Sequence, residues 1–239
     1  MALPQDHARA VQRLGRHAAE LAGRKLTAAE LEEPHRNIAL GSLYLAGLLR
    51  LGRRRHQAGG DGDGYSIGGN HFLHACRRNV DLTYIVMDNH VYGMTKGQAS
   101  PTTGEDWTHS KLTPEGTGVT AIQPVELALA CGASFIARGY AGDPNGVARL
   151  IAEGICHPGF AVIHILSPCV TYRADQKSWK TLVHAATEAP TSDAREAARR
   201  ILDDDGFTTG VLLADRRRPF RPTTGRPVPL SEIEKEFRV

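Results

Sequence analysis

Residues 59–89 read GGDGDGYSIGGNHFLHACRRNVDLTYIVMDN, and this stretch decides the fold. Within it, residues 66–79 are expected to form a turn followed by an amphipathic helix, whose last turn carries two arginines that complement the helix dipole. Residues 80–87 are rich in β-branched and aromatic side chains and have the length of a buried strand. Glycines let the backbone approach a ligand closely, and a helix N-terminus offers free N–H groups to phosphate.

The downstream sequence continues the alternation of helices and strands. Helices are expected at 124–132 and 143–157, strands at 134–140 and 160–166, and a last helix at 191–205, capped by Thr191 or Ser192, leads to a strand at 208–214. This alternation predicts an α/β fold in which helices flank a parallel sheet with right-handed crossovers. Residues 92–118 contain five glycines and two prolines without periodicity, so we expect a long ordered loop there.

Composition narrows the class of protein. The 239 residues are 41% apolar and 23% charged, which is typical of a soluble globular chain. No apolar run has the roughly 20 residues of a membrane helix and no export signal is visible, so a cytoplasmic location without a membrane partner is expected. The four cysteines include no close pair, which excludes a disulfide scaffold and a paired-cysteine zinc site. Basic residues are interspersed with acidic ones, so nucleic acid is not an expected partner.

Two acidic residues lie among the glycines, Asp61 and Asp63. The turn matches neither the dinucleotide fingerprint nor the Walker A motif. A diphosphate bound at neutral pH generally needs a divalent cation, and Mg²⁺ prefers oxygen ligands. Asp61 supplies one ligand, and Asn89, 28 residues later at the end of the predicted strand, supplies a second. Because α/β sheets bind ligands at the carboxyl ends of their strands, the pair predicts a magnesium–diphosphate site.

A longer run carries a family resemblance. GGDGDGYSIGGNHFLHACRRNVDLTYIVMDNHVYGMTKGQASPTT (59–103), with LSPCVTY (166–172), resembles the β subunit of 2-oxoacid:ferredoxin oxidoreductases, of the 2-oxoglutarate or broad 2-oxoacid type. The resemblance covers about residues 59–215 and implies the diphosphate-binding half of a thiamine diphosphate fold. It also implies a heterodimer with an α subunit that decarboxylates a 2-oxoacid, transfers the acyl group to coenzyme A and passes electrons to ferredoxin.

The same resemblance implies roles for individual residues. Mg²⁺ is expected on the side chains of Asp61 and Asn89 and on the carbonyl of Val91. The diphosphate turn would comprise Gly62, Asp63, Gly64 and Tyr65, with Gly93 and Met94 against the cofactor. Lys96, in TKGQ, matches a lysine positioned for an anionic substrate or coenzyme A, and Cys169 matches one of four cysteine ligands of a [4Fe–4S] cluster.

The first 58 residues depart from the family, which supplies its other three cluster cysteines from this region, two of them in a CxxC pair. Residues 1–58 contain no cysteine, and the remaining Cys76, Cys131 and Cys156 are expected to be small core residues. Arginines 53–55 precede the glycine turn, and burying them unpaired in a central strand would cost several kcal/mol each.

We therefore expect an atypical basic segment at 1–58, which carries ten Lys or Arg against five Asp or Glu. A thiamine diphosphate-binding domain at 59–215 and a peripheral tail at 216–239 would follow it. A frameshift, a mis-called start or a gene rearrangement is our hypothesis for the first segment.

Three functions stay open: a catalytic β subunit, a non-redox thiamine diphosphate protein without a cluster, and an incomplete subunit that binds its partner without turnover.

The histidines do not predict a metal or proton-transfer site. His71 and His74 are three apart on a helix but lack a third ligand, and nothing assigns a proton-transfer role to His90.

Overall fold

The strands form one mixed sheet. The computed structural model describes residues 55–220, so the predictions for 1–54 and for 221–239 lie outside the described residues. The sheet has the order β1-β2-β4-β3-β6-β5. Its strands are β1 (Arg55–Gly60), β2 (Leu82–Asp88), β3 (Phe135–Tyr140), β4 (Phe160–Leu166), β5 (His184–Ala185) and β6 (Thr208–Ala214).

The predicted strands β2, β3 and β4 are parallel, and they are joined by β1, a parallel strand that was not predicted and that includes Gly59 and Gly60 of the expected glycine turn. By contrast, β6 runs antiparallel to β3. The difference arises after β4, because residues 167–183 make no crossover helix that packs along the sheet. The chain therefore enters β5 from the edge where β4 ends, and β5 and β6 are parallel to each other but opposed to the other four strands.

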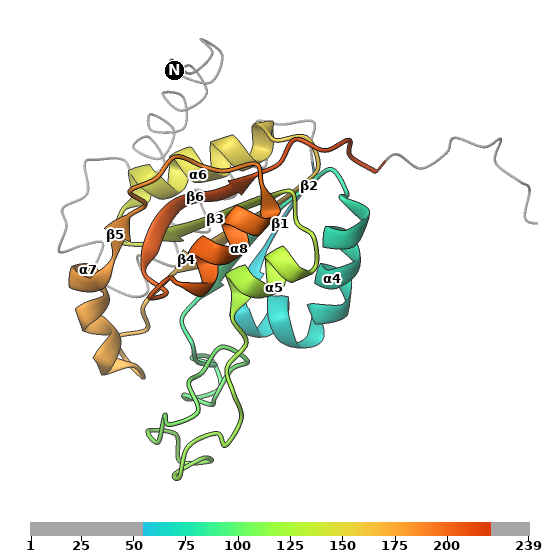
Figure 1. Ribbon diagram of the computed structural model, residues 1–239. Coiled ribbons are helices and arrows are strands. Elements are labelled where there is room, and N and C mark those ends of the chain that lie inside the picture. The colour runs from blue at the N-terminus through green and yellow to red at the C-terminus, as the bar shows by residue number, and fades with distance from the viewer. Residues whose placement is uncertain (1–54, 221–239) are drawn as a thin grey trace, which may run out of the picture.

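Helices cover both faces of the sheet. In Figure 1, α4, α5 and α8 lie on one face and α6 lies on the other. The reason is the handedness of the crossovers: the chain moves from β1 to β2 and on to β3 in one direction, then returns to β4, so a right-handed connection puts α6 on the opposite face. The helices are α4 (Gly69–Arg78), α5 (Pro124–Ala130), α6 (Pro144–Cys156), α7 (Trp179–Leu182) and α8 (Ala194–Leu202).

Each face has its own apolar core. Phe72 of α4 packs against the rings of Tyr84 and Phe160 on the three-helix face, and Ile151 of α6 belongs to the cluster on the other face. Every residue of β4 is buried, because this strand is central and both of its faces are covered. By contrast, β1 lies at the edge of the described sheet, and Arg55 is its first residue. The predictions for Arg53 and Arg54 lie outside the described residues.

Two predicted helices differ at their ends. The first is preceded by a single π-helical turn, Asp63–Ile67, before α4 begins. The last is shorter than predicted, and its cap is Asp193, whose carboxylate accepts a 2.8 Å hydrogen bond from the Arg195 N–H. The prediction of Thr191 or Ser192 as the cap is therefore wrong. The Thr191 hydroxyl accepts a hydrogen bond from the N–H of Asp193 and not from the helix.

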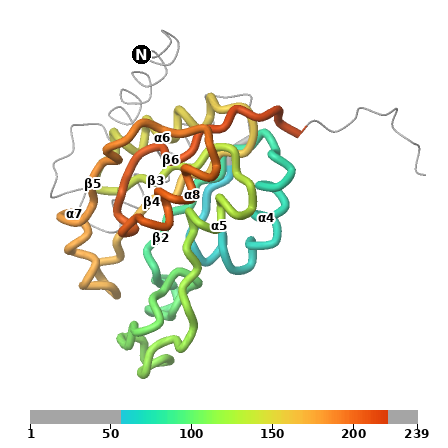
Figure 2. The backbone as a smooth tube through the Cα atoms, viewed as in Figure 1, coloured from blue at the N-terminus to red at the C-terminus, as the bar shows by residue number. Residues whose placement is uncertain are grey.

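The segment between β2 and α5 projects from the sheet. Figure 2 shows it as a green extension that leaves the carboxyl end of β2 and returns to α5. Residues 89–123 form turns and two isolated bridges, with no helix or strand, as the glycine and proline content predicts. Across residues 55–220, no helix combines the length and the apolar character needed to cross a bilayer.

Candidate functional site

Two buried carboxylates meet where β1 and β2 end. The strands pair with Gly60 opposite Met87, so Asp61, just after β1, lies beside Asp88, the last residue of β2. Asp61 is 3% exposed and Asp88 is fully buried. The Thr102 hydroxyl oxygen lies 2.9 Å from Asp61 Oδ2 and 2.7 Å from Asp88 Oδ1. A hydroxyl carries one proton, so Thr102 can donate to only one of these carboxylates at a time.

The two carboxylates have opposite pKa shifts. Burial, followed by the nearby charge of Asp88, raises the pKa of Asp61 to about 6. Burial alone would also raise the pKa of Asp88, but the hydrogen bond with His164, 3.0 Å away, and the neighbouring His90 lower it to about 2. A cation at Asp61 would favour its ionised form, so the electrostatics of this carboxylate suit a metal ligand.

The turn after β2 is held from several sides. Asn89 Oδ1 accepts a 3.0 Å hydrogen bond from the Val91 N–H. His90 adopts a left-handed backbone, with φ of 52°, and its N–H donates to Asp88 Oδ1. Its carbonyl accepts from the Thr103 hydroxyl at 2.8 Å and from Arg173 at 3.1 Å. Such a conformation persists only when surrounding contacts determine it, as they do here.

One buried glutamine joins this turn to the segment after β4. Gln176 is 1% exposed, and its amide nitrogen donates to the Asn89 carbonyl at 2.8 Å. Its amide oxygen accepts from the Cys169 N–H at 2.7 Å. The segment that carries Cys169 therefore lies beside the turn that carries Asn89.

The glycine turn is closely packed. A Cβ atom added at Gly62 would lie 2.0 Å from Tyr92 Cε1, and one at Gly64 would lie 3.3 Å from the Tyr84 hydroxyl oxygen. Tyr65 is buried with its ring edge-on to Phe72, and its hydroxyl has no hydrogen-bond partner among the described residues. A side chain at Gly62 would therefore displace the Tyr92 ring, whereas one at Gly64 would make only a tight contact.

The other predicted site residues lie farther along the loop. Gly93 lies next to Cys169, since a Cβ atom on it would be 3.8 Å from the Cys169 sulfur. Met94 is 98% exposed, and Lys96 is exposed with a left-handed backbone, φ 72°. Within residues 55–220, no three His, Cys, Asp or Glu side chains are arranged to hold a metal ion.

The remaining cysteines lie away from Cys169. Cys76 is fully buried, as predicted, and Cys131 is half-buried. Cys156 is exposed at the end of α6, so its prediction as a core residue is wrong. Cys131 and Cys156 precede β3 and β4, whereas Cys169 follows β4. Cys131 and Cys156 therefore lie near the amino ends of the strands and Cys169 near the carboxyl ends, separated by the length of a strand, roughly 20 Å.

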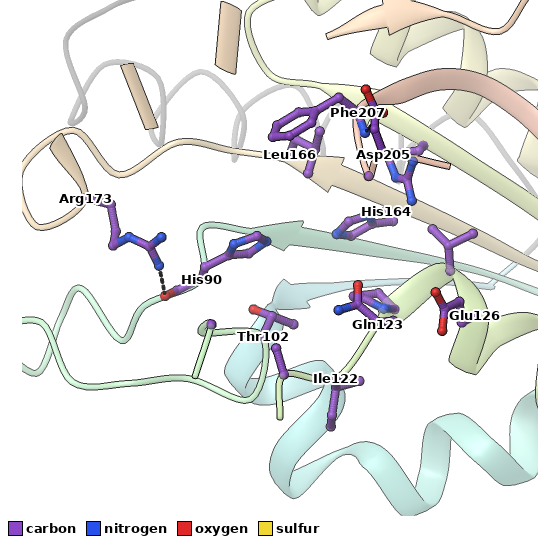
Figure 3. Close-up of a pocket in the computed structure, with 16 residues that line it drawn as sticks. His90, Thr102, Ile122, Gln123, Glu126, His164, Leu166, Arg173, Asp205 and Phe207 are labelled. Carbon is purple, nitrogen blue, oxygen red and sulfur yellow. Dashed lines mark hydrogen bonds between the residues drawn. The ribbon is translucent and has the colours of Figure 1, made fainter. Parts of the chain in front are cut away.

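A pocket of about 280 Å³ adjoins the carboxylate pair. Figure 3 shows it between the end of β4, the start of α5 and the turn before β6, with Arg173 bonded to the His90 carbonyl. Arg138, on its wall, forms an ion pair with Asp204. Its polar lining includes His90, Thr102, Gln123, Glu126 and His164, and its apolar lining includes Ile122, Leu166 and Phe207.

Sequence reasoning missed several residues of this site. Asp88 adjoins Asn89 and could have been suspected from that position. Thr102, His164 and Gln176 carry no comparable signal, because they reach the site from 41, 76 and 87 residues away from their partners Asp61, Asp88 and Asn89.

The fold and the site define an α/β protein with a buried, hydroxyl-rich acidic site at the carboxyl ends of its parallel strands. The chain belongs to the thiamine pyrophosphate enzymes: their C-terminal TPP binding domain matches residues 39–165. This match begins before residue 59, where the resemblance quoted above starts.

Curated relatives agree with this family. The 2-oxoglutarate synthase subunit KorB of Archaeoglobus fulgidus is 46% identical over 114 residues, 48% of this chain and 42% of that protein. The 2-oxoacid:ferredoxin oxidoreductase subunit beta of Saccharolobus solfataricus is 49% identical over 114 residues, 48% of this chain and 37% of that protein. The chain thus spans about two-fifths of the length of these relatives.

A solved structure supports the same fold. The 2-oxoglutarate:ferredoxin oxidoreductase from Magnetococcus marinus, with 2-oxoglutarate, coenzyme A and succinyl-CoA bound, matches with a TM-score of 0.65 and 33% identity. The match covers 76% of this chain and 66% of that one.

Proposed function

We propose that the chain is the β subunit of a cytoplasmic 2-oxoacid:ferredoxin oxidoreductase and holds the diphosphate end of Mg²⁺-bound thiamine diphosphate. The observation that carries this proposal is the register of β1 and β2, which puts Asp61 and the turn at Asn89 at the same sheet edge. The enzyme would convert a 2-oxoacid such as 2-oxoglutarate to acyl-CoA with an α subunit and ferredoxin as partners.

The donor atoms suit Mg²⁺. Asp61 offers a carboxylate whose raised pKa a cation would lower, and the carbonyl of Val91 offers a second hard oxygen. Asn89 Oδ1 already accepts one hydrogen bond from the Val91 N–H, which leaves its second lone pair for an ion. The three proposed ligands are therefore oxygens, as Mg²⁺ requires.

When bound, thiamine diphosphate supplies the carbanion chemistry that removes carbon dioxide from a 2-oxoacid. The role of this chain is to bind and orient it. Gly62 and Gly64, with Asp63 and Tyr65, would form the turn around the diphosphate, while Gly93 and Met94 would lie along the cofactor. Lys96 is exposed and free to meet an anionic substrate or coenzyme A.

Binding of the cofactor tests the proposal directly. Titration calorimetry of the full chain with thiamine diphosphate should give heat only when Mg²⁺ is present. Asp61→Asn and Asn89→Ala should abolish this binding, whereas Asp106→Asn, at an exposed loop position, should leave it unchanged. Unaltered binding in Asp61→Asn would reject the metal site.

A second candidate is a thiamine diphosphate protein without its own iron–sulfur cluster. A cubane cluster needs four thiolates. Cys169 lies at the carboxyl ends of the strands, whereas Cys131 and Cys156 lie near their amino ends. Cys76 is buried in the core. The cysteines of these 239 residues therefore do not fit one cluster. Iron and acid-labile sulfide analysis of the chain co-expressed with its α subunit decides, because about four irons per chain would eliminate this candidate.

A further inference from the structure

A turn of hydroxyl side chains lies against the carboxylate pair. Ser100, Thr102 and Thr103, here called the hydroxyl turn, are 7%, 4% and 2% exposed, although they belong to the projecting loop. The Ser100 N–H donates to the Thr103 hydroxyl at 2.7 Å, and the Thr103 N–H donates to the Ser100 carbonyl at 3.0 Å. The turn therefore has a fixed internal shape.

Within this turn, Thr102 contacts the carboxylates of Asp61 and Asp88, and other residues hold the Asp88 carboxylate in place. Asp88 is already fixed, because Oδ2 is 3.0 Å from His164 Nε2 and Oδ1 accepts from the His90 N–H. Asp61 is the first residue after β1, and its carboxylate interacts with the hydroxyls of Ser100 and Thr102 of the hydroxyl turn. The Thr102 oxygen lies 2.9 Å from Asp61 Oδ2. A hydroxyl fixed on Oδ2 sets the rotation of the carboxylate group and turns Oδ1 in another direction.

We propose that Thr102 is a positioning residue for the cation site, and this inference rests on the proposed function. In this proposal the single Thr102 proton is donated to Asp61 Oδ2, because Asp88 is already held by His164 and the His90 N–H, and Asp61 Oδ1 is presented to Mg²⁺. Groups that hydrogen-bond to a metal ligand orient it before the ion arrives, and losing one typically weakens metal binding by about 10–100-fold. The projecting loop thereby contributes to the metal site without supplying a ligand from the hydroxyl turn.

Three substitutions at Thr102 and one control separate the role of the hydroxyl from that of the side-chain shape. Thr102→Val keeps the shape and removes the hydroxyl, whereas Thr102→Ser keeps the hydroxyl. Thr181→Val is the matched control, because the exposed Thr181 also donates one hydrogen bond, to the Ser178 carbonyl. Thr102→Ala is a second variant without the hydroxyl and serves if the valine variant does not fold.

The experiment measures thiamine diphosphate binding to the full chain by calorimetry over a range of Mg²⁺ concentrations. We expect Thr102→Val and Thr102→Ala to need about 10–100-fold more Mg²⁺ for half-maximal binding. At saturating Mg²⁺, their affinity for thiamine diphosphate should return to that of the unaltered chain, which a purely structural defect would not allow. Thr102→Ser and Thr181→Val should match the unaltered chain throughout.

Three results would overturn this inference but not the proposed function, and the first two are an unchanged Mg²⁺ requirement in Thr102→Val and an equal loss in Thr102→Ser. A defect in Thr102→Val that persists at saturating Mg²⁺ would also overturn it and assign Thr102 a structural role. Absence of Mg²⁺-dependent binding in the unaltered chain would reject the proposed function itself, together with this inference.

Discussion

Substitution of Gly62 by alanine tests the packing that joins the glycine turn to the loop after β2. The added Cβ atom would lie 2.0 Å from Tyr92 Cε1 and 2.8 Å from Cζ, well inside the roughly 3.5–4.0 Å of a normal carbon contact. The tyrosine ring would have to move by about 1.5 Å. Overpacking of this kind costs about 1–3 kcal/mol of the free energy of unfolding.

The backbone itself accepts alanine, since Gly62 has φ −62° and ψ −45°. Once the ring is removed by Tyr92→Ala, the same Gly62→Ala change should stabilise the chain by about 0.4–1 kcal/mol, because alanine reduces the entropy of the unfolded state. The double-mutant cycle should therefore report a coupling of about 1.4–4 kcal/mol between the two positions.

Urea unfolding of the four chains measures this coupling, provided that the slope of the free energy against urea stays constant. Gly69→Ala is the control, because a Cβ atom there meets nothing within 4 Å, and no cost is expected. An equal cost of Gly62→Ala with and without the Tyr92 ring would refute the contact.

Three further changes test the core, a cap and a buried ion pair. Phe72→Ala, at a fully buried ring, should lower the free energy of unfolding by about 3–5 kcal/mol in urea titrations, and a loss below about 1 would contradict its place in the core. Asp193→Ala should cost about 1 kcal/mol by the same measurement, and no change would mean that it does not cap α8. Burial acts to raise the pKa of Asp204, but hydrogen bonds with Thr208 and Arg138 lower it below its ordinary 3.8. Its stabilisation is therefore present above that value and lost as pH falls, so the unaltered chain should lose more stability than Asp204→Asn between pH 7 and about pH 3.

Local sequence features predicted most of the fold. The apolar run at 160–166 and the strand at 208–214 occur as predicted, and α5 and α6 begin at or within one residue of their predicted starts. These features depend on neighbouring residues, through side-chain periodicity, helix-starting prolines and glycine turns, so one stretch of chain contains the information. The antiparallel β6 could not be foreseen, because strand direction depends on where the preceding connection runs.

The site likewise has residues that the sequence predicted and residues that only the tertiary structure revealed. The sequence alone placed Asp61 in a glycine turn and Asn89 at a strand end, and the family of the chain follows from that motif. Only the tertiary structure brought Thr102, His164 and Gln176 to it, because each contact crosses between elements far apart in the chain. The two pKa shifts also depend on the tertiary structure, because desolvation and hydrogen bonding between distant residues exist only once the chain has folded. Burial raises the pKa of Asp61, whereas hydrogen bonds lower the pKa of Asp88.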